Sequence, residues 1–245
     1  MSSTAPALPA PDSNLGTRIW WGLLLLGAVL AAAHAVVVVT VDGYGDPISK
    51  ARMFAIPAIG YAHMLGGAIA SIIGPFQFLK SIRQRHPRWH VWLGRAYLTL
   101  VAASACAGLY LSPGSYASNT FGIAFILLAL AWLYTGTRAF MTIRARDVQA
   151  HRRWMIRNYA LTYSAVTLRF QMPLLIIGGM SPVLALNVVG WTCWIPTLIA
   201  VEWWMRRQQT LQSHGNPLTI EPNRSRSGGV ARSRSGVARL DRPAR

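Results

Sequence analysis

The stretch from Gly60 to Tyr97, GYAHMLGGAIASIIGPFQFLKSIRQRHPRWHVWLGRAY, contains an apolar run, a short basic turn and the start of a second apolar run. The apolar part, taken as residues 57–79, is long enough at 1.5 Å per residue to cross a hydrocarbon core about 30 Å thick as a helix. The basic residues that follow it closely are Lys80, Arg83, Arg85 and Arg88. Because short loops rich in Lys and Arg stay in the cytoplasm, this pattern predicts a membrane hairpin with a cytoplasmic turn.

The composition assigns the whole chain to a membrane. Of its 245 residues, 53% are hydrophobic and 13% are charged, which is too apolar for an ordinary soluble domain. The formal net charge of +17 does not indicate nucleic acid binding, because the basic residues fall in short loops and in a terminal tail. The sequence therefore predicts an all-α integral membrane bundle, with the lipid bilayer as its partner and no nucleic acid.

Hydrophobic runs predict a bundle of six transmembrane helices within residues 18–206. Their expected bounds are about 19–41, 57–79, 91–111, 121–140, 156–179 and 183–205. The segment Arg138–Arg157 is expected to be a second basic inner loop, and its length of about twenty residues predicts that it is helical at the interface. The fifth helix is expected to be interrupted at Arg169, Gln171 and Pro173. Six spans with basic inner loops predict a multi-pass protein of the bacterial inner membrane, with both termini in the cytoplasm.

The two ends of the chain are polar. Residues 1–17 are rich in Pro, Ala and Ser, and residues 207–245 contain the near repeat RSRSGGVA and RSRSGVA. Such segments cannot bury a core, so both are expected to be disordered, and the basic tail is expected to rest near anionic lipid. No segment remains for a soluble catalytic domain, and enzymatic activity is left undecided.

Ionisable side chains inside membrane spans are functional candidates by default. His34 and His63 lie at similar depths on consecutive antiparallel helices, so the two rings are candidates to meet. Arg169 lies near the midplane, where it needs a partner or a water-filled cavity, and a cofactor or substrate anion or the carbonyls freed by Pro173 would suit it. Glu202, the only acid in the predicted spans, lies too close to the inner end to match it.

A second histidine pair, His90 and His151, lies at the basic inner turns. Neutral imidazoles from two helices are suitable axial ligands for haem iron, and Arg152 is among the cations available for haem propionates. The alternative is that these histidines are interfacial anchors and that the outer ones are packed side chains. The predicted cofactor-binding residues are His90, His151, His63, His34, Arg169 and Arg152, for a b-type haem whose iron ligands would be His90 and His151.

The small residues from Gly66 to Gly74 favour close helix packing over ligand binding. Gln77 follows Pro75, and its side chain is expected to bond backbone groups that the proline exposes.

Several motifs together resemble a known family. They are H-x2-GG at His63, GPFQF at Gly74, R-x-P-x-x-H ending at His90 with LGRAY after it, and HRRWMIRNYA at His151 followed by LRF at Arg169. This set resembles the bacterial predicted membrane proteins known as domain of unknown function 2306, over residues 58–205. The resemblance implies a membrane fold and brings no established activity with it.

The arrangement is also similar, more loosely, to transmembrane di-haem b-type cytochromes, whose four-helix core holds two haems through histidines on facing helices. This similarity implies a haem at His90 and His151. The predicted helix 121–140 has no histidine, so a second haem would need His34. Two functions therefore remain, a haem-binding electron-transfer protein and a cofactor-free transporter, sensor or assembly factor. A transporter would be consistent with Arg169 and with helices 57–79 and 156–179 broken at their prolines, although no internal repeat of the two halves supports it.

Overall fold

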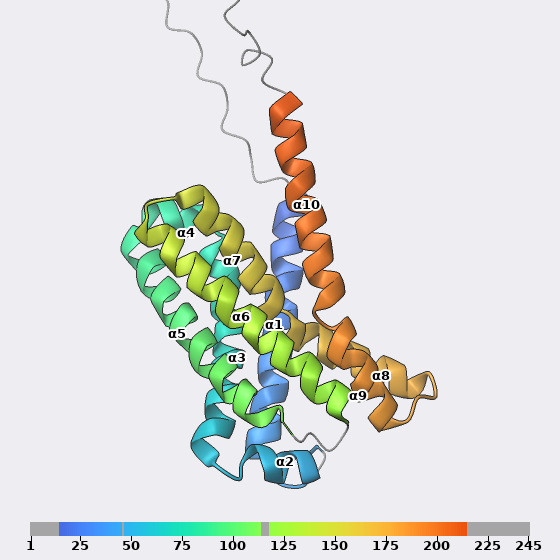
Figure 1. The fold of residues 1–245 in the computed structure, drawn as a ribbon. Helices are drawn as coiled ribbons and strands as arrows, with labels where there is room; N and C mark the ends of the chain where they lie inside the picture. Colours follow the sequence, from blue (N-terminus) through green and yellow to red (C-terminus); the bar gives the residue numbers. More distant parts are fainter. Residues whose placement is uncertain (1–14, 46, 114–117, 215–245) are drawn as a thin grey trace, which may run out of the picture. The chain divides into compact units, whose positions relative to one another are not determined.

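The computed structural model describes residues 15–45, 47–113 and 118–214, and within them the regular elements are all helices. The helices are α1 (Leu15–Thr40), α2 (Pro47–Met53), α3 (Pro57–Gln77), α4 (Lys80–Arg85), α5 (Pro87–Leu111), α6 (Asn119–Arg144), α7 (Val148–Thr162), α8 (Ser164–Ile177), α9 (Pro182–Thr192) and α10 (Ile195–His214) (Figure 1). The chain divides into two units, residues 1–205 and residues 206–245. Of the second unit, the structure describes only residues 206–214, which form the end of α10.

Within the described residues, six helical stretches are long and apolar enough to cross a membrane. This confirms the predicted all-α bundle of six membrane-spanning helices. Four spans are the single helices α1, α3, α5 and α6, and two are helix pairs, α7–α8 and α9–α10. Helices α2 and α4 are short and lie in the connections between spans.

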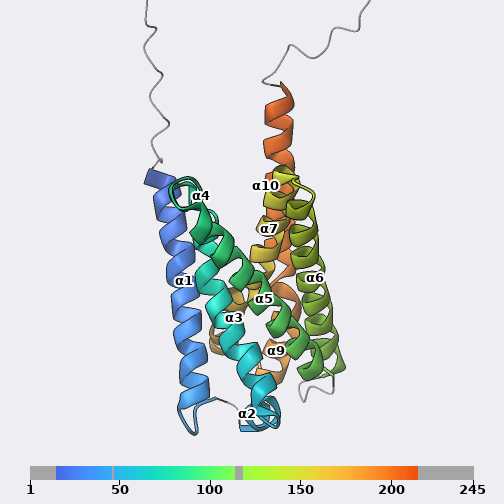
Figure 2. The same cartoon turned by 90° about the vertical axis from the view of Figure 1, so that its left-hand side faces the viewer.

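Consecutive spans of the first unit pack side by side. Helix α3 packs most extensively against α5, α6 packs against α7, and α5 packs against α6. Helix α1 lies along α3 and also contacts α8, which packs against α9. Figures 1 and 2 show α1, α3, α5 and α6 running alongside one another. The seam between α1 and α8 brings together residues far apart in the sequence.

A buried polar network joins α5, α6 and α7. The Tyr97 hydroxyl donates a hydrogen bond to Oδ1 of Asn158 at 2.8 Å and shares another with the Thr162 hydroxyl at 2.7 Å. The Asn158 amide donates to the Trp132 carbonyl and to Oγ1 of Thr135, both at 2.9 Å. The Trp132 indole donates to the Thr162 hydroxyl at 2.9 Å. Because these groups satisfy one another away from water, the network fixes how the three helices align.

Gly74 lets α3 and α7 approach closely, since a Cβ there would lie 2.1 Å from the Tyr159 ring. The Tyr159 hydroxyl donates to the Ser71 carbonyl at 3.2 Å, the carbonyl whose helical partner Pro75 cannot supply. The packing interpretation of this stretch is therefore supported. The expectation for Gln77 is wrong, because its amide nitrogen is buried without a hydrogen-bond partner.

The last two spans are each broken near the middle. The break between α7 and α8 lies at Tyr163. The prediction of an interruption at Arg169, Gln171 and Pro173 is wrong, because these residues lie within α8. The break after α9 leaves the Thr192 carbonyl to accept a hydrogen bond from Nε2 of Gln171 at 3.2 Å. Polar side chains of α8 thus bond carbonyls that the neighbouring break exposes.

The second basic connection is shorter than predicted. Helix α6 continues to Arg144 and α7 begins at Val148, so the predicted loop Arg138–Arg157 consists of two helix ends and a tight turn. Arg146 has a φ of 61° in this turn, and the Asp147 carboxylate accepts a hydrogen bond that caps α7. Long basic side chains tolerate a helical position near the interface because their heads reach water.

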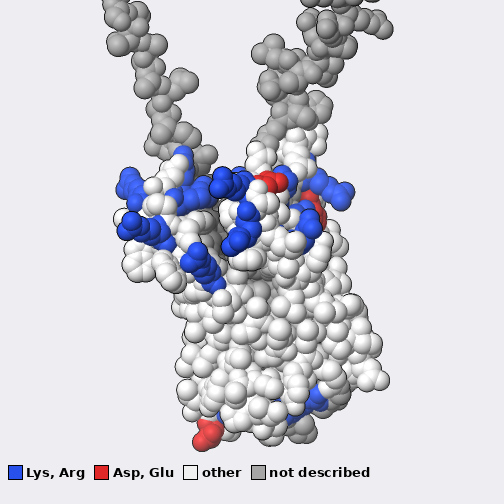
Figure 3. All heavy atoms as spheres, turned by 60° about the vertical axis from the view of Figure 1, so that its left-hand side comes forward, with Lys and Arg blue, Asp and Glu red and all other residues white. Residues whose placement is uncertain are grey.

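The predicted disordered tail from residue 207 is helical as far as His214. The predicted disordered segment 1–17 is helical at residues 15–17, where α1 begins. The rest of both segments lies outside the described residues. On the face of the first unit in Figure 3, Lys and Arg gather at the end formed by α4 and the α6–α7 turn, above a broad uncharged belt. We name this end the basic end.

Candidate functional site

Arg169 lies on α8 and reaches toward α1. Its Nε donates a hydrogen bond to Nδ1 of His34 at 3.1 Å, and its Nη1 donates to the Ala165 carbonyl at 2.7 Å. An imidazole that accepts at Nδ1 carries its proton on the other nitrogen and is neutral. Arg169 therefore has protein partners but no counter-charge among them.

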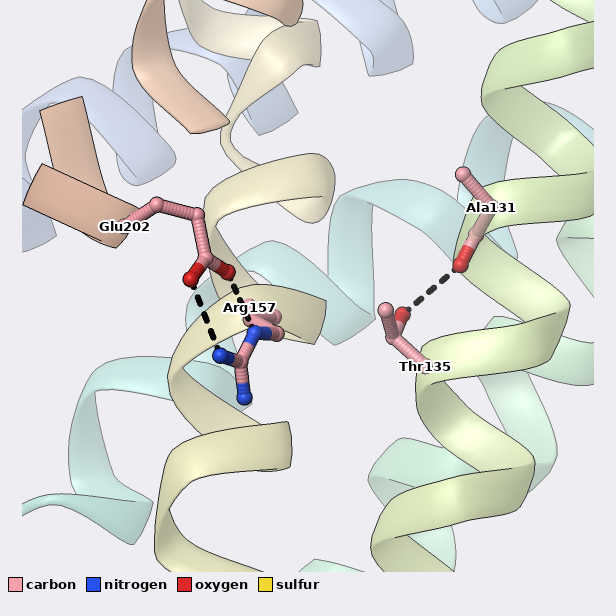
Figure 4. A network of polar contacts seen from close by, with 4 residues as sticks. All are labelled: Ala131, Thr135, Arg157 and Glu202. Carbon is pink, nitrogen blue, oxygen red and sulfur yellow. Dashed lines mark hydrogen bonds and ion pairs between the residues drawn. The ribbon is translucent and has the colours of Figure 1, made fainter. Parts of the chain in front are cut away.

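Glu202 forms an ion pair with a different arginine. It is the only acid within the six spans of the described residues. Arg157 of α7 binds its carboxylate with two groups, Nε to Oε1 and Nη2 to Oε2, the latter at 2.9 Å (Figure 4). The expectation that Glu202 does not match Arg169 is confirmed. The partner that the sequence did not reveal is Arg157.

Arg157 is also held from its other side. Its guanidinium lies 4.7 Å from the centroid of the Trp154 ring, and that of Arg138 lies 5.3 Å from the same ring. A planar guanidinium favours both the aromatic face and the two-oxygen carboxylate contact. Arg157 is therefore oriented by both the carboxylate and the indole ring, as expected of a structural ion pair.

Figure 4 also shows Thr135 of α6, whose hydroxyl donates to the Ala131 carbonyl at 2.9 Å.

His63 links α3 to α5. Its Nδ1 lies 3.1 Å from the Ser104 carbonyl oxygen, and the Ser104 hydroxyl donates back to the Ala62 carbonyl at 2.8 Å. The ring also packs against Gly108, where an added Cβ would lie 3.3 Å away. His34 and His63 therefore each bond to a different group, His34 to Arg169 and His63 to the Ser104 carbonyl.

At the basic end, His90 lies near the start of α5 and His151 near the start of α7. Nδ1 of His151 bonds to the Ala139 carbonyl at 2.8 Å. Nδ1 of His90 is buried without a hydrogen-bond partner. The predicted propionate partner Arg152 is exposed in the first turn of α7.

A bis-histidine haem site fits these residues poorly. A ligating histidine normally donates its second ring nitrogen to a carbonyl or carboxylate. His151 has such a bond and His90 does not. The outer pair is also unsuitable, because Nδ1 of His34 accepts from Arg169 and the His63 ring is wedged against Gly108. The only feature here that supports a bound haem is the hydrogen bond that orients the His151 ring.

The buried network of Tyr97, Trp132, Thr135, Asn158 and Thr162 was missed by sequence reasoning. The expected sites were ionisable groups inside apolar runs, with Gln77 as the one neutral amide among them, and hydroxyl groups were left out. The available signal was Asn158, a strongly polar residue followed by an apolar stretch. Such a residue in a membrane span must find a partner on another helix.

Neither a curated protein nor a solved structure matches this sequence. The motifs from His63 to Arg169 lie within one family model, described as "Predicted membrane protein (DUF2306)", which matches residues 60–205. Because this match covers more than half of the chain, the protein belongs to that family of predicted membrane proteins.

Proposed function

We propose that this protein is a cofactor-free membrane carrier or sensor that binds an oxyanion, a carboxylate or a phosphate, at Arg169. The observation that carries the proposal is the set of partners of Arg169, His34 and the Ala165 carbonyl, which are both neutral. A guanidinium within a membrane span is costly unless an opposite charge or water accompanies it. Since Glu202 is paired with Arg157, a bound anion is the remaining source of that charge.

The helix breaks next to Arg169 support a carrier. The fifth and sixth spans are both discontinuous, at Tyr163 and after Thr192, and their halves α8 and α9 pack together. Discontinuous helices commonly form the intramembrane ligand sites of transporters, because the ends of their half-helices face the bound ion. Arg169 lies on one of these halves.

The test is anion-dependent thermal stability of the full chain in neutral detergent. Acetate, inorganic phosphate and the longer-chain oxyanions octanoate and dodecyl phosphate are compared with chloride at equal ionic strength. A ligand that binds the folded state stabilises it by about 2.7 kcal/mol at a hundredfold excess over its dissociation constant. We expect at least one oxyanion to raise the melting temperature of the parent and not of Arg169→Gln.

Arg144→Gln is the matched control, because Arg144 is an exposed arginine at the end of α6. It should retain the full response to the anion. An equal response in Arg169→Gln, or none in the parent, would refute the proposed site.

The second candidate function is electron transfer through a b-type haem at His90 and His151. It is favoured by one observation, the bond from His151 to the Ala139 carbonyl, which leaves Nε2 of the ring for a metal. A visible spectrum of the purified protein separates the two functions. We expect no Soret band, whereas a Soret band lost in His90→Ala or His151→Ala would favour haem.

We further propose that the basic end faces the cytoplasm of a bacterium, with both termini inside and the tail beyond residue 207 near anionic lipid. The gathering of Lys and Arg around α4 and the α6–α7 turn supports this orientation. A periplasmic reporter fused after Arg206 should be inactive. Activity there would reverse the topology.

A further inference from the structure

We infer that the oxyanion bound at Arg169 is the head of an amphiphile, a carboxylate or phosphate that carries an acyl chain and enters sideways from the lipid. The inference rests on the proposed function and adds the class of ligand and its route. It follows from the seam between α1 and α8, which is closed at both ends and open along its side.

The seam is closed toward the basic end. A Cβ added to Gly27 of α1 would lie 2.4 Å from the Tyr163 hydroxyl and 3.0 Å from Cγ1 of Val166, where α8 begins. Helices packed this closely leave no room for an added methyl group, and therefore none for a ligand. Gly27 lies about two helical turns before His34.

Tyr44 closes the seam from the loop that follows α1. Its ring packs edge-on against the His34 ring, with the two centroids 5.7 Å apart. The flanking residues Gly43 and Gly45 have φ values of 76° and 88°, which glycine adopts without strain. This turn folds Tyr44 back over His34 and covers it from the loop.

Between these closures, the site is open along the side of the bundle. His34 is exposed, and its hydrogen bond with Arg169 lies at the surface. Large apolar side chains of the same two helices are also exposed, Leu30 of α1 at 51% and Phe170 and Leu174 of α8 at 56% and 67%. Within a bilayer, such a surface faces acyl chains. A ligand that arrives along it is already dissolved in lipid.

A second copy of this chain offers no carboxylate from its spans, because within the described residues the one acid there, Glu202, is already paired with Arg157. A small soluble anion would have to leave water and cross lipid to reach Arg169, at the cost of its hydration. An amphiphile places its anionic head at Arg169 while its chain stays in the lipid. The charge and the surroundings therefore both favour an amphiphile.

The test uses the full chain in nanodiscs of neutral phosphatidylcholine. Acetate, hexanoate and laurate form one titration series, and inorganic phosphate and dodecyl phosphate form the other, so that the two heads are distinguished. Lauryl alcohol controls for the chain without the charge. The measured quantity is the saturable binding that Arg169→Gln loses and Arg144→Gln retains.

We expect affinity, expressed against the aqueous concentration, to rise about fourfold for each added methylene in at least one series. Lauryl alcohol should not compete. Acetate binding as tightly as laurate, with both lost in Arg169→Gln, would refute the amphiphile and leave the proposed function intact. Absence of any Arg169-dependent binding would overturn both.

A separate variant tests the route by which the ligand reaches Arg169. Tyr44→Ala opens the loop side without touching Arg169, and laurate binding should be unchanged because the ligand enters along the side. A large gain in acetate affinity in this variant would mean that anions enter past Tyr44. That result would overturn the lateral route.

Discussion

Arg157 and Arg169 lie on the same membrane span, one on each side of its break at Tyr163, and their partners differ in charge. Arg157 faces the Glu202 carboxylate and the Trp154 ring. Arg169 faces a neutral imidazole and a backbone carbonyl. The role of a charged residue in a span therefore depends on the partner that it contacts. Depth alone does not distinguish a structural arginine from one that holds a ligand.

The two sites should therefore respond differently to mutation. Removing one member of an ion pair away from water leaves the other charge uncompensated, which destabilises the fold. Removing an arginine with neutral partners leaves no charge behind.

Glu202→Gln should give the largest loss of stability. It leaves the Arg157 guanidinium without its counter-charge at a site where the two side chains are 21% and 31% exposed. Breaking a fully buried pair costs about 3–5 kcal/mol, and partial exposure should reduce this to about 2–3 kcal/mol. The measurement is denaturant unfolding of the purified protein in detergent.

The control is the double variant Arg157→Gln with Glu202→Gln, in which neither charge is stranded. It should recover part of the stability lost by Glu202→Gln. A double variant whose loss equals the sum of the losses of Glu202→Gln and Arg157→Gln would show that the two charges are not coupled.

Arg157→Lys should have the second largest effect. The ammonium retains the charge but not the fork that contacts both carboxylate oxygens, and it fits the Trp154 face less well. A loss of about 1 kcal/mol is expected, close to the net value of one hydrogen bond. Full stability in this variant would mean that charge alone accounts for the pair.

The spans could be predicted from sequence because each is an apolar run of sufficient length. Their ends could not, because hydropathy marks where apolar residues stop and not where a helix stops. Arg144, at the end of α6, shows the difference, since it lies past the predicted span in a helix that continues. The break at Tyr163 was missed because proline was taken as the marker, and Pro173 is accommodated inside α8.

The candidate site was predictable in part. Arg169 and His34 stood out as ionisable residues in apolar runs, and Arg169 was expected to need a partner. Their contact joins residues 135 positions apart, and the contact of Arg157 with Glu202 spans 45 positions. Which residues pair at such separations depends on how the helices pack. The spacing of residues along one sequence does not reveal that packing.

His34→Glu should make the Arg169 site resemble the Arg157 site. A carboxylate facing the guanidinium supplies the missing counter-charge, so the variant should lose its response to added oxyanions. Its stability should change by less than about 1 kcal/mol, because attraction between the charges offsets the cost of removing the new carboxylate from water. The check is the anion-dependent melting temperature, with His34→Gln as a neutral control that retains the response. A His34→Glu protein that still responds to oxyanions would argue against a counter-charge at this position.

Arg169→Gln should have the smallest effect on stability, although it removes a charge from a membrane span. The variant loses hydrogen bonds to His34 and to the Ala165 carbonyl, each with a net value of about 1 kcal/mol. It also removes a guanidinium whose transfer into the bilayer costs roughly 2.5–3.5 kcal/mol at a helix centre. These contributions oppose each other, and the glutamine amide can replace one of the bonds, so without ligand the unfolding free energy should change by less than about 1 kcal/mol. A loss as large as that of Glu202→Gln, measured under the same denaturant conditions, would mean that Arg169 has a protein counter-charge and is a structural residue like Arg157.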